Sequence, residues 1–182
     1  RGGEYPDSPY SQLWQMTVHE VDSLISMMNQ PVVEVYGHVY RPPATTWKRE
    51  STATAELTFD NGCRVVMVST SDARVNMTEL RVECERGAVV YRNTASFGGA
   101  EEILAGRDRA VGLKPLPIDD TEPDETRLLD QRVAESFATW INGGLEPETS
   151  GRNNLQVLSV LDGLIESDHS CRPVQLDIGS AA

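Results

Sequence analysis

The chain has 182 residues, a length typical of one domain with its own hydrophobic core. Its composition, 39% hydrophobic and 24% charged, is typical of a soluble globular protein, and no apolar stretch approaches the roughly 18 residues that a membrane span needs. The net charge of -12 and the single, scattered placement of the 16 basic residues argue against binding to DNA or RNA, which depends on clustered lysine and arginine.

The cysteines indicate a reducing compartment. Cys63, Cys84 and Cys171 are odd in number and widely spaced, so they predict neither a disulfide framework nor a zinc site. We therefore expect a cytoplasmic location. The sequence begins at Arg1, without an initiator methionine or a basic and apolar leader, and we expect either a processed chain or a piece of a longer one.

The first predicted helix carries the main candidate site. Residues 1–12 form a glycine- and proline-rich lead-in that we expect to be irregular, and apolar spacing predicts a helix over 12–28. Its broad apolar arc includes Leu13, Trp14, Met16, Val21, Leu24 and Met27. The narrower face holds a polar stripe in which Gln15, His19, Asp22 and Ser26 follow one another at intervals of four, three and four residues.

Strands follow this helix. Residues 31–40 alternate and are rich in β-branched side chains, and 51–70 contain two strand-like runs around Asn61-Gly62, a two-residue hairpin signal. Residues 78–93 repeat the plan, with Gly87 at the turn position that needs a positive φ. Residues 94–123 are rich in glycine, proline and acid and predict a long excursion with one or two edge strands.

Two helices, 127–141 and 153–167, and a last strand near 172–178 complete the pattern. The order predicts an α+β fold, a mainly antiparallel sheet with helices packed on one face. The other face is left free, and residues 32–39 and 63–69 are apolar at both parities. We therefore expect a homo-oligomer that forms through this open sheet face.

The polar stripe permits two interpretations. It is either an ordinary solvated helix face or the lining of a cleft in which His19 acts as a general acid and base, with Asp22 orienting it. His38, in a strand, and His169, near the end of the last helix, are expected to be structural. No cluster of histidine, cysteine and carboxylate residues at ligand spacing predicts a metal site.

The ordered motifs resemble the C-terminal half of the Gfo/Idh/MocA family, the glucose-fructose oxidoreductase and inositol dehydrogenase-like NAD(P)-dependent enzymes. The stretch LWQMTVHEVD is similar to a family pattern close to L-x-D-x-G-x-H-x-x-D, with matches at Leu13, His19 and Asp22. Four later stretches are similar to family elements in the same order: AELTFDNGCRVVMVST, VECERGAVV, SFATWINGG and LQVLSVLDGLIESDHSCRPVQL.

The resemblance implies hydride transfer between a nicotinamide and a sugar or polyol carbon, with His19 exchanging the hydroxyl proton and with Gln15 and Asp22 on the substrate side. Gln15 stands where the family has an aspartate, and Thr17 where it has a glycine. NAD or NADP would be bound by a preceding nucleotide-binding domain that residues 1–12 cannot supply, so residues 13–182 are expected to form a single substrate-binding and oligomerisation domain that is inactive alone.

Two alternatives remain open at this stage. The chain could be a non-catalytic assembly or ligand-binding module whose site has decayed, with Gln15 as the sign, or an unrelated small α+β ligand-binding protein.

Overall fold

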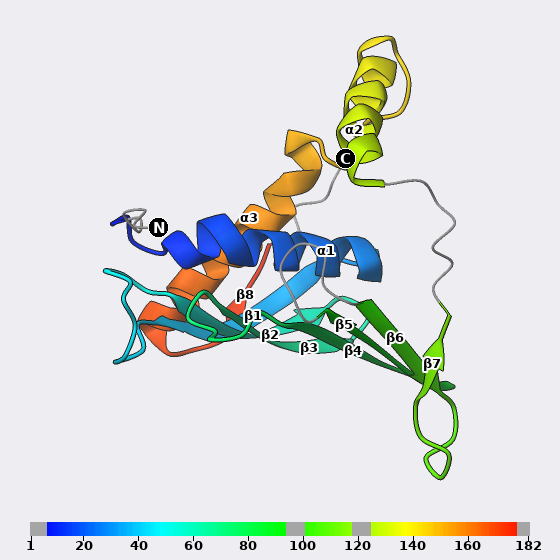
Figure 1. Cartoon of the computed structure of the whole chain (residues 1–182). Helices are drawn as coiled ribbons and strands as arrows, with labels where there is room; N and C mark the ends of the chain where they lie inside the picture. The colour runs from blue at the N-terminus through cyan, green and yellow to red at the C-terminus, as the bar shows by residue number, and fades with distance from the viewer. Residues whose placement is uncertain (1–6, 94–100, 118–124, 178–182) are drawn as a thin grey trace. The chain divides into compact units, whose positions relative to one another are not determined.

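The computed structural model describes residues 7–93, 101–117 and 125–177. They fall into two compact units, the first comprising residues 1–72 and 136–182 and the second residues 73–135. Part of the predicted lead-in (1–6) and parts of the predicted excursion (94–100 and 118–124) lie outside the described residues. Each unit contains one four-stranded antiparallel sheet (Figure 1).

The sheet of the first unit has the strand order β3-β2-β1-β8. Its strands are β1 (Val32–Tyr40), β2 (Thr52–Phe59), β3 (Arg64–Thr70) and the two-residue β8 (Val174–Gln175), shorter than the strand predicted at 172–178. The amide of Phe59 donates to the carbonyl of Cys63, and Gly62 has a φ of 81°. The hairpin therefore has a three-residue loop, residues 60–62, in place of the predicted two-residue turn. Gly62 takes the last position of this loop, which has a positive φ.

Two helices cover one face of this sheet: α1 (Val18–Met28) and α3 (Gly151–Ser170) (Figure 1). The core between them and the strands consists of side chains that are almost completely buried: Val21, Val35, Leu57, Phe59, Val157, Val160, Leu161 and Leu164. Gly37 in β1 permits this close packing, since a Cβ there would lie 2.1 Å from the carbonyl oxygen of Thr54 and 2.7 Å from Leu164 Cδ1.

Helix α3 also contacts the edge of β1. β8 pairs with β1 only at Glu34 and Val35, so the later amides of β1 lack a strand partner on that side. The amide of Gly37 donates to Ser167 Oγ at 3.1 Å, and that of Val39 donates to Asp168 Oδ1 at 3.0 Å. Side chains of a helix thus satisfy backbone donors that a neighbouring strand would otherwise bind.

The outer face of the same sheet is mixed. Four large apolar side chains are exposed on it, Tyr36, Tyr40, Val66 and Val68, and Val66 is 80% exposed. Between them the outward positions of β2 carry Thr54, Glu56 and Thr58. The sequence predicted that β1 and β3 are apolar on both faces. Because β2 lies between them and is polar at its outward positions, the exposed apolar area of this face is smaller than that prediction implied.

The second unit contains a sheet in the order β4-β5-β6-β7. The strands are β4 (Thr78–Cys84), β5 (Gly87–Asn93), β6 (Glu101–Gly106) and β7 (Lys114–Leu116). Gly87 has a φ of 153°, which confirms the predicted glycine position, and Glu85 and Arg86 form the turn. Both β6 and β7 lie within the predicted excursion, but only β7 is an edge strand, since β6 pairs with β5 on one side and with β7 on the other.

Helix α2 (Glu125–Ile141) crosses the boundary between the units. Of the five apolar residues that the sequence places on this helix, Val133, Phe137, Trp140 and Ile141 are exposed, and the side chain of Leu129 lies outside those described. The helix was correctly predicted, but the described part of the chain does not bury its apolar face. All described strand pairings are antiparallel and helices cover one face of the first sheet, so the predicted α+β class is confirmed.

Candidate functional site

The helix that carries the polar stripe starts with a π-helical segment, η1 (Leu13–Thr17), in which the amide of Val18 donates to the carbonyl of Leu13. This turn holds one residue more than an α-helical turn and changes the direction of the side chains before it relative to those after it. The buried face consists of Leu13, Thr17, Val21 and Leu24. Trp14, Met16 and Met27, predicted on the apolar arc, are instead exposed because the structure covers a narrower face.

All four residues of the stripe, Gln15, His19, Asp22 and Ser26, are exposed. His19, Asp22 and Ser26 follow one another on the regular helix, whereas Gln15 lies within the π-helical segment and is offset from them. Ser26 Oγ donates a hydrogen bond to Glu148 Oε1. Within the described residues the Asp22 carboxylate has no hydrogen-bond or ion-pair partner, so no described side chain holds it in place.

A buried polar network lies beneath the start of this helix. Gln12 is almost fully buried; its Nε2 donates to Ser69 Oγ at 3.1 Å, and its Oε1 accepts from Ser71 Oγ at 2.6 Å. These bonds fix the start of the helix to the end of β3. The buried hydroxyls of Ser11 and Thr17 have no hydrogen-bond partner among the described residues. Thr17 stands where the resemblance implies a glycine. Its hydroxyl is an unpaired polar group on the buried face of the helix that carries the stripe.

Glu20, next to His19, was not singled out by sequence reasoning. Its side chain is exposed overall, but desolvation of the carboxyl group raises its pKa. A backbone hydrogen bond, a hydrogen bond with Ser69 and the charge of His19 act in the opposite direction without cancelling this effect. Glu20 thus holds a proton more tightly than an ordinary glutamate, next to the candidate acid and base.

The other two histidines make structural contacts. His38 Nδ1 lies 3.5 Å from Asp168 Oδ1, and its Nε2 lies 3.4 Å from Tyr36 Oη. Tyr10 Oη lies 2.6 Å from His169 Nε2. Desolvation, followed by the charges of Asp168 and Glu50, raises the pKa of Tyr10, so its hydroxyl stays protonated, and the tautomer of His169 decides which of the two groups donates. The contact attaches the lead-in to the end of α3.

The described residues do not fit a nucleotide cofactor. A dinucleotide site needs a glycine-rich turn between a strand of a parallel sheet and a following helix, and the described sheets are antiparallel throughout. Within those residues no group of three or more histidine, cysteine or carboxylate side chains could hold a metal ion. None of the described helices is long and apolar enough to cross a membrane.

The fold and the exposed helix define an α+β domain with a histidine-bearing helix packed on an antiparallel sheet. Residues 6–90 match the family described as the GFO/IDH/MocA C-terminal domain. This match, over slightly less than half of the chain, agrees with the resemblance found in the sequence.

The chain is also similar to individual proteins, one by sequence and two by fold. The uncharacterised protein y4oX of Sinorhizobium fredii is 22% identical over an alignment of 179 positions, which covers 92% of this chain and 47% of the relative. The fold is similar to that of an aldose-aldose oxidoreductase from Caulobacter crescentus, crystallised with glycerol, with a TM-score of 0.74 and 17% identity over 91% of this chain and 47% of the other. It is also similar to the WlbA dehydrogenase from Bordetella pertussis, crystallised with NADH and UDP-GlcNAcA, with a TM-score of 0.66 and 21% identity over 94% and 46%. The chain thus spans about half the length of these relatives.

Proposed function

We propose that this chain is the substrate-binding and oligomerisation domain, residues 13–182, of an NAD(P)-dependent oxidoreductase that acts on a sugar or polyol hydroxyl. His19 is the general acid and base that exchanges the hydroxyl proton, and Gln15 and Asp22 contact the substrate. NAD or NADP is the cofactor of a full-length parent and is held outside the residues described here. The parent is a cytoplasmic protein.

One observation carries this proposal: His19 is exposed on a helix within the segment that matches the family. An acid and base must reach its substrate, and imidazole is the side chain best suited to proton transfer near neutral pH. The half-length coverage of both solved oxidoreductases supports a parent with a further domain.

The stripe is also the basis of the second candidate, a non-catalytic assembly or ligand-binding module. The observation that favours it is Gln15, a neutral amide where the resemblance implies an aspartate. A site without that carboxylate keeps a binding surface but lacks a charged group that would hold or polarise a substrate.

The experiment that separates the two candidates measures NAD(P)-dependent oxidation of a panel of sugars and polyols by the full-length parent. His19→Ala should lower kcat by roughly 10²- to 10⁴-fold, the range expected for loss of a general acid and base. His169→Ala is the matched control, since it removes a histidine that contacts Tyr10, and it should leave kcat unchanged. Equal rates for His19→Ala and the wild type, or a wild type without activity on the whole panel, would favour the assembly module.

The same domain forms a homo-oligomer of two-fold symmetry through the outer face of the β3-β2-β1-β8 sheet. The support is the exposed apolar group of Tyr36, Tyr40, Val66 and Val68, which a second copy would remove from water.

A further inference from the structure

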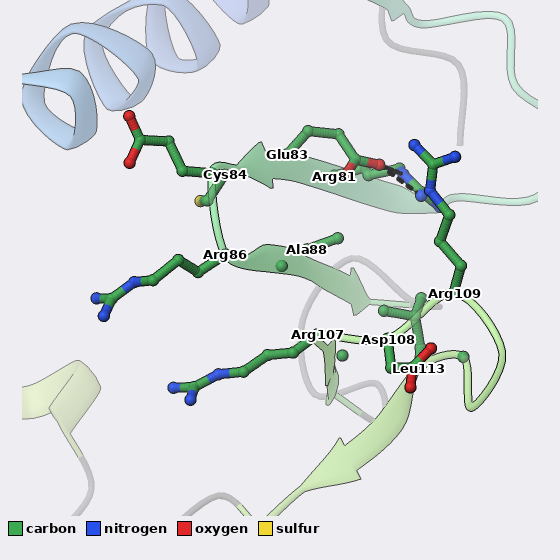
Figure 2. A pocket seen from close by; sticks show the side chains of 13 residues that line it. Arg81, Glu83, Cys84, Arg86, Ala88, Arg107, Asp108, Arg109 and Leu113 are labelled. Atoms are coloured by element: carbon green, nitrogen blue, oxygen red, sulfur yellow. Dashed lines mark hydrogen bonds and ion pairs between the residues drawn. The ribbon is translucent and has the colours of Figure 1, made fainter.

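The second unit contains a groove whose chemistry differs from that of the chain as a whole. It has a volume of about 640 Å³, and its lining contains the turn between β4 and β5 and the loop between β6 and β7 (Figure 2). Four of the chain's 16 basic residues line it: Arg81, Arg86, Arg107 and Arg109. In a chain with a net charge of -12, so many arginines in one place reverse the local balance of charge.

The strand register brings the two turns together. Cys84 pairs with Gly87 and Ala88 with Gly106, so Arg86 and Arg107 leave the sheet at the same end. The approach is close: a Cβ at Gly87 would lie 2.4 Å from the carbonyl oxygen of Gly106 and 3.2 Å from Arg107 Cγ. Glycine at position 87 therefore sets the spacing of the two arginines.

Three of the arginines are available to a ligand. Arg81 Nε donates to Glu83 Oε1 at 2.7 Å, so this pair is neutralised internally. The carboxylate of Asp108 accepts from the amide of Ala110 at 2.8 Å and stabilises the loop. Among the described residues, Arg86, Arg107 and Arg109 have no ion-pair partner, whereas Glu85 and Asp108 are the remaining acidic residues of the lining.

Figure 2 shows how these side chains are arranged. Arg86 and Arg107 extend in the same direction from their two turns, and Arg109 lies on the other side of the groove. Each guanidinium presents several N–H donors in a planar fork that matches the oxygens of a phosphate group. The volume is within the range of sites for small molecules.

We propose that this groove binds a small molecule with two or more phosphate groups, held by Arg86 and Arg107 with Arg109 opposite. A single monovalent anion would compensate the charge of one guanidinium, whereas a molecule with two phosphate groups carries enough negative charge to compensate both. This binding is independent of His19, whose helix belongs to the other unit.

The test is calorimetric titration of the whole chain with inorganic pyrophosphate at about 50 mM salt, where screening is weak. The wild type should bind with saturation below about 10 mM. Arg86→Gln and Arg107→Gln should each weaken binding about tenfold, the factor expected for loss of one charge-assisted contact, and the double variant should abolish it. Arg64→Gln is the matched control: it removes an exposed arginine that pairs with Glu56 in the first unit, and it should change nothing.

Two further titrations keep the proposal open to refutation. Citrate, a multivalent anion without phosphorus, and triglutamate, a model of an acidic peptide, should bind at least about tenfold more weakly than pyrophosphate, because their carboxylates are spread along a carbon chain, whereas pyrophosphate concentrates its charge on two adjacent phosphoryl groups. Tighter binding of triglutamate, no saturation with pyrophosphate, or equal affinities of wild type and double variant would each overturn the assignment. The variants concern exposed side chains, so their circular dichroism should match that of the wild type.

Discussion

Two leucines of α3 provide a direct test of how the first unit is held together. Leu161 is fully buried between the helix and the sheet, whereas Leu155, earlier on the same helix, is 60% exposed. Replacement of each by alanine removes the same atoms and changes helix propensity by the same small amount. Any difference between the two variants in the free energy of unfolding therefore measures burial against the sheet.

The expected difference follows from the packing. Leu161→Ala leaves a cavity in a core where Val157, Val160 and Leu164 are also almost completely buried, and such replacements cost about 2–5 kcal/mol. Leu155→Ala should cost about 0.5 kcal/mol or less, as expected for a largely exposed position. The difference should therefore be at least about 1.5 kcal/mol.

The assay is urea denaturation of the whole chain, followed by circular dichroism at a helical wavelength, with the m-values of both variants compared. The packing of α3 on β1 predicts that only Leu161→Ala moves the midpoint substantially. A difference below about 0.5 kcal/mol at equal m-values would show that this face of α3 is not buried in solution, and the arrangement of the first unit would have to be reconsidered.

Three further outcomes are expected. Ser150 is fully buried and its side chain accepts from the amide of Asn153 at 3.3 Å, so Ser150→Ala should lower the free energy of unfolding by about 1 kcal/mol in the same assay, and Ser150→Asp should retain more of it. The pKa of Glu20 is higher in the folded than in the unfolded state, so the folded state binds the proton more tightly, and the free energy of unfolding falls as the pH rises through the folded-state pKa. Glu20→Gln should therefore raise the Tm at pH 7, and this gain should vanish below the ordinary glutamate pKa. An equal gain in Tm at both pH values would contradict this. Val68→Lys, on the exposed outer sheet face, should reduce the mass measured by light scattering to that of the 20.1 kDa monomer, while Val75→Lys, also exposed but outside this face, should not; a wild type that is already monomeric at tens of micromolar would refute the oligomer.

The elements that depend on local pattern were predictable. The period of alternation and the turn residues are properties of neighbouring positions, so β1, the β2-β3 hairpin and α3 were found from the sequence, with shifts of a few residues at their ends. The π-helical segment Leu13–Thr17 was not, because its extra residue leaves no mark on composition or spacing. Trp14, Met16 and Met27 were assigned to the apolar arc, but periodicity does not show how much of that arc the structure covers.

Features that depend on long-range pairing were not predictable. Periodicity identifies an apolar face on α2, but it cannot say whether the same chain covers that face, and Phe137 and Trp140 are exposed. The basic residues are scattered in the sequence, and only the register of two hairpins brings Arg86 and Arg107 to one groove. Tyr10 and His169 are 159 positions apart, so nothing in the sequence indicated their contact.

The bonds between α3 and the edge of β1 have a consequence for the protein's behaviour at high concentration. An uncovered strand edge offers its amides to the same edge of another molecule and is a starting point for aggregation. Here Ser167 and Asp168 occupy the amides of Gly37 and Val39, so the edge is available to other chains only when the end of α3 separates from the sheet. Variants that weaken the packing of α3 on the sheet should therefore aggregate during refolding before they lose their fold. The helix thus shields the edge of β1 from other chains in addition to its role in the core.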